Sequence, residues 1–215
     1  MSGSASRAYR SELRDAQASQ TRARVLDAAA QEFAARGYAG TTLAAIARGA
    51  GVSVETVKLQ GAKHELLLAA WNRRLTGSDE PAGAPFLDDE TRRAQALALS
   101  DEDLLASLVE TAAGISAESV GLWQAFAGAA RFDEHVRVAF EATLAMRRTE
   151  FGRLIELFDA RGMIANDRPR DELAATLILL ASAEGYQHLV AESGMSRAGY
   201  RQWLALAIER LVLGP

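Results

Sequence analysis

The stretch TTLAAIARGAGVSVETVKLQGAK, residues 41–63, decides the fold of the N-terminal part of the chain. Its apolar residues follow helical spacing on both sides of an interruption at Gly51. A glycine there supplies the positive φ that a tight turn needs, and Ser53 is a good N-cap for a following helix. The pattern predicts two short helices joined by a turn, with Val57 packing back on the first helix. In such a helix-turn-helix unit, the second helix can lie in a DNA major groove.

Helices are also predicted on both sides of this unit. The segment 21–36 carries an apolar stripe at helical spacing and is followed by Gly37, a common residue just after a helix. A further helix is predicted from about residue 63 to 75. The polar residues 1–19 form either a flexible arm or an additional helix, and they carry Arg7, Arg10 and Arg14 at helical spacing. Basic arms of this kind can reach phosphate or the minor groove.

The rest of the chain is also mainly helical in its pattern. The segment 77–100 is rich in glycine, proline and acid, and we interpret it as a long loop. Five further helices are predicted, over residues 100–117, 119–130, 133–161, 169–193 and 196–213. No segment favours a strand. The chain is therefore predicted to be all-α with about nine helices, comprising a helix-turn-helix domain at 20–76 and a helical body at 77–215.

Composition and charge restrict the class of function. There is no cysteine, the three histidines are scattered, and there is neither a glycine-rich phosphate loop nor a nucleophile elbow. We therefore expect no enzyme, no cofactor and no metal. No apolar run approaches the ~18 residues of a membrane helix, and the N-terminus lacks the apolar segment of a secretory signal, so we expect a cytoplasmic protein without a membrane partner.

Charge is distributed unevenly along the chain. The first 63 residues contain nine Arg or Lys and five Asp or Glu, which gives +4, so the remainder must carry −8 to reach the total of −4. A basic head on an acidic body suits a head that meets phosphate. Ordinary scatter explains an excess of four charges equally well, so charge alone does not decide the function.

The N-terminal part resembles the TetR family of bacterial transcription regulators over about residues 20–72. The resemblance is carried by TRARVLDAAAQEFAARGYAGTTLAAIARGAGVSVETV at 21–57 and by the pattern K-x-E-L-L that begins at Lys63. It implies a homodimeric repressor that binds a palindromic double-stranded DNA operator and is released by a small-molecule effector. It also implies that the body at 77–215 binds this effector and dimerises, through the helices at 169–193 and 196–213.

One segment departs from the pattern of the family. The family usually has V-Y-x-x-F, in which the tyrosine contacts phosphate and the phenylalanine packs the recognition helix, whereas Val57 is here followed by KLQGAK. Lys58 could replace the phosphate contact and Leu59 the packing. The alternative function is therefore a helical ligand-binding or partner-binding protein whose head binds DNA weakly or not at all.

Polar residues in and around the two short helices are the candidates for DNA contacts. Thr41 or Thr42 caps the first helix, and its hydroxyl can donate to phosphate. Lys58 and Lys63 would hold phosphates, and the remaining candidates would face base edges in the groove. The full set is Thr41, Thr42, Ser53, Glu55, Thr56, Lys58, Leu59, Gln60 and Lys63.

Large apolar side chains are the candidates for an effector pocket, because such pockets are mostly apolar with a few polar groups. Taken singly, each of them is more typical of a core residue. The set is Trp71, Trp123, Phe126, Phe140, Met146, Phe151 and Tyr186. Glu184 and His188 stand four residues apart and can form either a ligand anchor or a structural pair.

Overall fold

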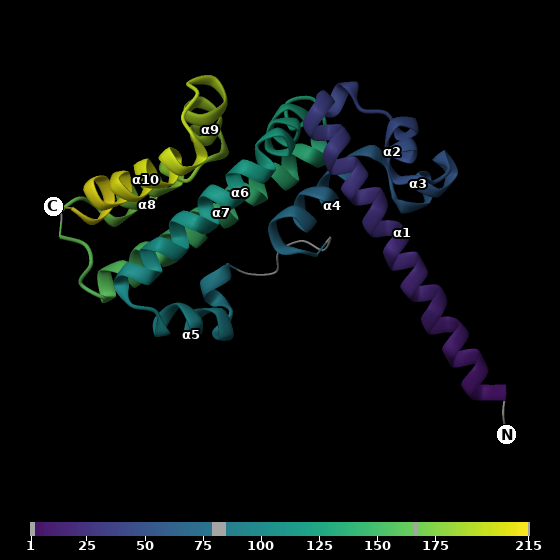
Figure 1. Ribbon diagram of the computed structural model, residues 1–215, viewed down its shortest axis with the longest axis horizontal. Helices are drawn as coiled ribbons and strands as arrows, with labels where there is room; N and C mark the ends of the chain where they lie inside the picture. The colour runs from purple at the N-terminus through teal and green to yellow at the C-terminus, as the bar shows by residue number, and fades with distance from the viewer. Residues whose placement is uncertain (1–2, 79–84, 166, 215) are drawn as a thin grey trace. The chain divides into compact units, whose positions relative to one another are not determined.

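The structure, a computed structural model, describes residues 3–78, 85–165 and 167–214, with side chains from residue 16 onward. All regular structure in these ranges is helical, which confirms the all-α prediction (Figure 1). The chain divides into two compact units. Unit 1 comprises residues 1–81 and 124–136, and unit 2 comprises residues 82–123 and 137–215.

Unit 1 contains the predicted helix-turn-helix and the helices around it. Its helices are α1 (Gly3–Gly40), α2 (Leu43–Ala50), α3 (Val54–Gln60) and α4 (Lys63–Thr76). Both α2 and α3 lie beside the C-terminal part of α1 (Figure 1). The backbone of the N-terminal arm is helical from residue 3, whereas the side chains of its three arginines lie outside the described residues. The helix is interrupted at Gly37, whose φ is 67°, as expected for a residue that ends a helix.

One core holds unit 1 together. It is formed by apolar side chains that recur at helical spacing along each helix. Each of these side chains is at most 5 % exposed. The core residues include Val25, Leu26, Phe33, Ile46, Val57, Leu66, Leu67, Trp71, Phe126 and Val136. The last two come from the chain segment 124–136, which therefore completes the core of unit 1.

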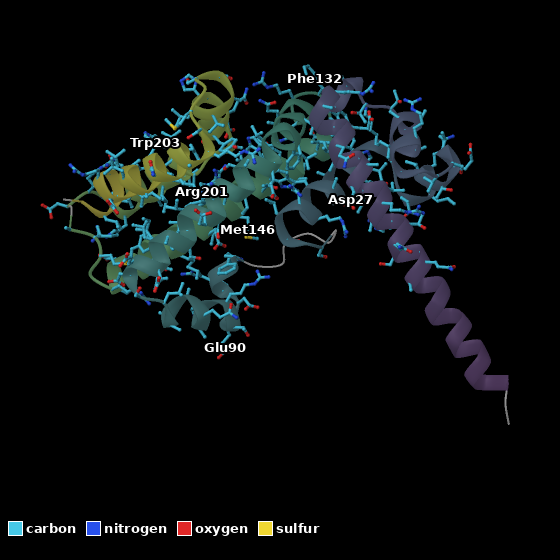
Figure 2. The ribbon with its side chains drawn as sticks, viewed as in Figure 1. Asp27, Glu90, Phe132, Met146, Arg201 and Trp203 are labelled. Atoms are coloured by element: carbon cyan, nitrogen blue, oxygen red, sulfur yellow. The ribbon has the colours of Figure 1, made fainter. Side chains whose placement is uncertain are left out.

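Unit 2 contains most of the remaining helices. Helix α6 ends in unit 1, and helix α7 begins there. The elements are η1 (Phe86–Asp88), α5 (Glu90–Ala98), α6 (Asp101–Ala129), α7 (Glu134–Ala160), α8 (Arg170–Leu180), α9 (Ala183–Tyr186), η2 (Gln187–Glu192), α10 (Arg197–Ile208) and η3 (Glu209–Leu213). Its core includes Ile155, Phe158, Leu173, Leu177, Tyr200, Leu204 and Ile208. An ion pair of 2.9 Å joins Arg201 of α10, labelled in Figure 2, to Glu110 of α6.

The interpretation of 77–100 as a loop is wrong for its second half. A 3₁₀ turn at 86–88 leads into α5, and Asp89 caps that helix by accepting a hydrogen bond of 2.9 Å from the amide of Arg92. The aspartate that suggested a solvated loop is therefore an N-cap. Leu87 and Ala96 are buried in the core of unit 2, which holds the segment in place.

The predicted break between 117 and 119 does not exist. Helix α6 continues through it without interruption. The side chain of Ser119, which was expected to begin a new helix, is buried and donates its hydroxyl proton to the carbonyl oxygen of Ile115 within the same helix. A buried serine can satisfy its hydroxyl on the preceding turn, so it need not end a helix.

The predicted single helix at 169–193 is broken instead. Helix α8 ends at Leu180, and Ser182 begins α9 by accepting a hydrogen bond of 2.9 Å from the amide of Gly185. A π-helical segment, η2, follows and ends before Gly194, whose φ is 74°. The helix at 196–213 is present, since Ser196 caps α10 through the amide of Gly199.

Candidate DNA-binding surface and body site

The turn between α2 and α3 has the predicted geometry. Gly51 adopts the left-handed conformation, with a φ of 65°, and its amide donates to carbonyl oxygens of the last turn of α2. Thr42 caps α2 by accepting from the amide of Ala45 at 3.1 Å. Thr41, in contrast, is 1 % exposed, and its hydroxyl donates to the carbonyl oxygens of Glu32 and Gly37. The structure therefore places the Thr41 hydroxyl inside unit 1.

Helix α3 is fixed at both ends. Ser53 accepts a hydrogen bond of 3.1 Å from the amide of Thr56, and the hydroxyls of these two residues lie 3.0 Å apart. At the other end, the guanidinium of Arg22 donates to the carbonyl oxygen of Gln60 at 3.1 Å. Val57 is fully buried. These contacts make α3 a short rod whose position on α1 is set by specific hydrogen bonds.

The side of α3 opposite Val57 is exposed. Glu55, Lys58 and Leu59 are exposed, and Leu59 reaches 85 %. The side chains of Thr56 and Gln60 are half-buried. The expectation that Leu59 replaces the packing of the missing aromatic residue is therefore wrong, because this side chain points away from the core.

Gly61 forms the atypical end of α3. Its φ of 142° and ψ of 171° belong to a region that side-chain-bearing residues rarely adopt. A Cβ atom at this position would lie 2.9 Å from Oε2 of Glu65. That same oxygen accepts a hydrogen bond of 2.7 Å from the amide of Ala62 and thereby caps α4. The short connection between α3 and α4 thus depends on a glycine.

Lys63 lies against the loop that follows Gly37. Its ammonium is 4.7 Å from the centre of the Tyr38 ring and donates to the carbonyl oxygen of Ala39 at 3.4 Å. Burial lowers the pKa of this ammonium. A phosphate contact through Lys63 therefore requires the side chain to leave Ala39.

A polar cluster in unit 1 had no signal in the sequence. The hydroxyl of Tyr38 donates to Asp133 at 2.9 Å, and the rings of His64 and His135 stack with their centres 4.7 Å apart. Burial, reinforced by Asp133, raises the pKa of Tyr38 to about 12. Burial of Asp133 tends to raise the pKa of its carboxyl group. Hydrogen bonds from Tyr38 and from the amides of Val136 and His135 outweigh this effect and keep the pKa low.

The predicted pocket residues fall into separate groups. In unit 1, Trp71 and Phe126 form a tilted ring pair at 5.5 Å, and both are buried. In unit 2, Trp123 and Phe140 form a similar pair at 5.0 Å, while Tyr186 packs edge-on against the buried ring of Tyr200. Met146 and Phe151 both lie on α7, and Met146 is labelled in Figure 2.

Arg147 is the residue of the body that sequence reasoning missed. Its guanidinium donates to the carbonyl oxygens of Ile178 and Ala181, at 3.1 and 3.4 Å, where α8 ends. It also lies within 6 Å of the centres of the Trp123 and Phe151 rings. Burial lowers the pKa of Arg147, although the nearby carboxylate of Glu184 opposes this shift.

Of the two alternatives for Glu184 and His188, the structural pair does not form. Glu184 accepts a hydrogen bond of 2.6 Å from the indole N–H of Trp123, and His188 instead pairs with Glu192 at 3.1 Å. Trp123, Arg147 and Glu184 therefore form an aromatic and charged group around the break after α8. We call these three residues, together with Phe151, the body cluster.

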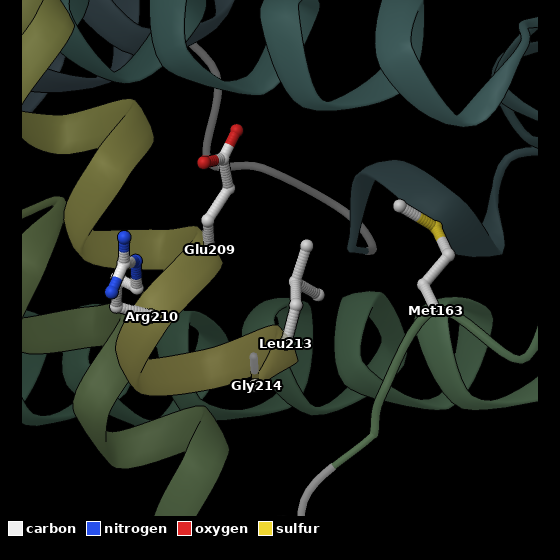
Figure 3. Close-up of a pocket in the computed structure, with 5 residues that line it drawn as sticks. All are labelled: Met163, Glu209, Arg210, Leu213 and Gly214. Carbon is white, nitrogen blue, oxygen red and sulfur yellow. The ribbon is translucent and has the colours of Figure 1, made fainter.

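A hollow of about 590 Å³ opens elsewhere on unit 2 (Figure 3). It contains none of the residues that the sequence suggested for a pocket. Its lining is formed by Met163, Glu209, Arg210, Leu213 and Gly214. No group of three or more histidine, aspartate or glutamate side chains is placed to bind a metal in the part of the chain that the structure describes. Nor is any described helix both long and apolar enough to span a bilayer.

Comparisons with known proteins agree with this geometry. Residues 25–60 match the family model described as "Bacterial regulatory proteins, tetR family". No curated protein matches the chain. Among solved structures, one from Saccharomonospora viridis, described as a transcriptional regulator in complex with choline, is 24 % identical with a TM-score of 0.71, and the alignment covers 92 % of this chain and all of that one.

Two further structures have the same fold. A TetR-family regulator from Rhodococcus sp. is 22 % identical with a TM-score of 0.67, covering 91 % of this chain and 100 % of that chain. A TetR-family member from Streptomyces coelicolor is 20 % identical with a TM-score of 0.53, covering 88 % and 89 %. The class of protein is thus an all-helical regulator with a helix-turn-helix DNA-binding domain. Within that class, the match over residues 25–60, which include α2 and α3, places the helix-turn-helix domain of this chain in the TetR family.

Proposed function

We propose that this protein is a repressor that binds a palindromic DNA operator as a homodimer and leaves it when a small molecule binds. The observation that carries the proposal is the exposed side of α3, from which Glu55, Lys58 and Leu59 project while Val57 is buried. The major groove admits an α-helix, and side chains on its outer side reach base edges and phosphates. Because the operator lies on the bacterial chromosome, we place the protein in the cytoplasm.

The proposed contacts include all the expected residues except Thr41, whose hydroxyl is used inside unit 1. Lys58 is exposed and would hold a phosphate. Thr42 accepts from Ala45 and still has a proton to donate to a phosphate at the N-terminus of α2. Ser53, Thr56 and Gln60 would lie at the edges of the contact. The remaining members, Glu55 and Leu59, are considered in the next subsection.

The proposed dimer uses α8 and α10, as the resemblance implies. Exposed leucines support this, since Leu179 of α8 is 69 % exposed and Leu206 of α10 is 51 % exposed. Leu211, in the π-helical turn that continues α10, is 47 % exposed. Large exposed apolar side chains on two helices that contact each other favour a protein interface. Two heads related by a two-fold axis would read half-sites about 34–36 Å apart.

We propose that the body, residues 77–215, takes up the effector. The body cluster supports this, because it combines aromatic rings with a partly buried charge, as small-molecule sites do. The choline complex of the regulator from S. viridis supports a small-molecule ligand for this fold. An effector would act by favouring a dimer in which the two α3 helices no longer match the spacing of the operator.

The test is to select DNA that the full chain retains from a random pool, and then to measure binding by gel shift at several salt concentrations. We expect a palindromic sequence whose affinity falls steeply with salt, because each phosphate contact releases a counterion. Sedimentation of the complex should give two chains per operator. Enrichment of no sequence would contradict the proposal.

The second candidate is a ligand-binding protein with an inactive head. Two observations favour it, namely the glycine that ends α3 and the engagement of Lys63 with Tyr38 and Ala39. In that case the full chain retains no DNA from the pool at low salt. The same selection therefore separates the two candidates.

A further inference from the structure

We infer that Leu59 and Glu55 determine the operator sequence, Leu59 by contact with the C5 methyl group of a thymine and Glu55 by accepting from the N4 amine of a nearby cytosine. This inference rests on the proposed function, because it assigns bases to a helix that the proposal places in the major groove. It depends on the arrangement of side chains around α3.

The two residues lie on the outward side of the helix. Val57 is fully buried and therefore marks the inward direction. At about 100° per residue, Glu55 and Leu59 point roughly 160° and 200° away from Val57, on either side of the outward direction. Both are exposed, whereas the flanking Thr56 is half-buried. A helix laid in a groove would therefore present these two side chains first.

The chemistry of each side chain limits what it can read. An apolar side chain has no hydrogen-bonding group, so its specific partner in the major groove is the thymine methyl. Leu59 is 85 % exposed, and burial against a methyl group would remove part of that apolar surface from water. A carboxylate is repelled by phosphate and accepts hydrogen bonds only. The amines in the major groove are cytosine N4 and adenine N6, and because the adenine amine stands beside the acceptor N7, which repels a carboxylate, cytosine N4 is the favoured partner of Glu55.

The two hydroxyl groups nearest to Glu55 already contact each other. The hydroxyls of Ser53 and Thr56 lie 3.0 Å from each other, and Ser53 also caps the helix. The Glu55 carboxylate and the Leu59 side chain have no such contact among the described residues. Four residues span about 6 Å along a helix, against roughly 3.4 Å per base pair. The thymine and the cytosine should therefore lie within about two base pairs of each other.

The experiment uses the full chain and the operator obtained by selection. Each thymine of a half-site is replaced in turn by deoxyuridine, which removes only the methyl group. At one position we expect the affinity to fall about fourfold, the value of burying a single methyl group. With Leu59→Ala, the same replacement should have no effect. With Lys58→Ala, binding weakens but the fourfold effect of the replacement remains.

A second arm tests Glu55. The same DNA pool is selected with the Glu55→Ala variant. The preference for cytosine should then be lost at one position, within two base pairs of the methyl-sensitive thymine. Circular dichroism shows whether the variants keep their helical content. DNA binding that is insensitive to deoxyuridine at every thymine would overturn the inference alone. Failure of the chain to retain any DNA would overturn the proposed function with it.

Discussion

The phenol of Tyr38 donates a hydrogen bond of 2.9 Å to the carboxylate of Asp133, the residue that caps α7. This bond joins two segments of unit 1 that are 95 positions apart in the sequence. Removing it in Tyr38→Phe should lower the free energy of unfolding by about 1 kcal/mol, the usual value for one hydrogen bond. Urea unfolding followed by circular dichroism measures the change. An unaltered unfolding midpoint would mean that the bond does not stabilise the protein.

Stability should fall as pH rises from about 10 to about 12. Burial raises the pKa of Tyr38 and of Tyr200 to about 12, with further contributions from Asp133 and Tyr186 respectively, whereas a free tyrosine ionises near pH 10. The unfolded chain therefore loses these protons first, so the stabilisation is complete below pH 10 and is lost as pH rises through 12. Urea midpoints measured across this range should decline less steeply for Tyr38→Phe than for the natural chain.

Substitution of Gly61 by alanine should destabilise the protein by about 1–3 kcal/mol. Alanine is strained at a φ of 142°, and its Cβ would lie 2.9 Å from the carboxylate of Glu65. The matched control is Gly152→Ala in α7, where a Cβ meets nothing within 4 Å. This control should stabilise the helix by up to about 1 kcal/mol. Equal effects of the two substitutions on the melting temperature would contradict the assigned conformation of Gly61.

Arg147→Met should destabilise the body by about 1–3 kcal/mol. The substitution leaves the carbonyl oxygens of Ile178 and Ala181 without their donor, and it removes the positive charge beside Glu184. The neighbouring Arg148 is exposed, so Arg148→Met is the matched control and should change stability by less than about 0.5 kcal/mol. Denaturant titration of both variants checks the prediction, and similar midpoints would contradict it.

Lys58→Ala should weaken binding to every DNA sequence and reduce the slope of log affinity against log salt by about 0.9, the value for one phosphate contact. Gel shifts at four or five salt concentrations measure the slope. Lys63→Ala is the comparison. The Lys63 ammonium contacts Tyr38 and Ala39, so the slope for this variant shows whether the side chain leaves Ala39 to contact a phosphate. A slope unchanged in Lys58→Ala would remove that residue from the interface.

Leu179→Glu should convert the proposed dimer into monomers, because it introduces a charge into an apolar interface. Leu97→Glu on α5 is the matched control, as this leucine is also exposed but lies outside α8 and α10. Sedimentation velocity distinguishes the two states, and operator affinity should fall with the dimer. A natural chain that sediments as a monomer would contradict the prediction before any variant is made.

Local signals allowed much of the fold to be predicted from sequence. The caps at Thr42, Ser53 and Ser196 are each completed within three residues, so they can be read directly from the sequence. The break after α8 was missed although Ser182 caps the next helix in the same manner, because the apolar run around it suggested one continuous helix. The aspartate that caps α5 was hidden in an acid-rich segment.

The candidate site was predictable only in part. The exposed side of α3 follows from helical periodicity once Val57 is assigned to the core. The contact of Arg147 with the end of α8 spans more than thirty positions, and the Tyr38–Asp133 bond spans 95. No local pattern encodes such pairs, because they depend on how separate helices pack.

The core of unit 1, which we call the head, also includes a distant part of the chain. This limits how the head can be transferred to another protein. Phe126 covers Trp71, and Asp133 receives the bond from Tyr38, yet both partners lie in segment 124–136. A fragment ending at residue 81 would leave the indole of Trp71 without the ring of Phe126 and the phenol of Tyr38 without its acceptor. A chimaera that grafts this head onto another body must therefore carry the end of α6 and the beginning of α7 as well, with the crossover points placed inside two helices rather than in a linker.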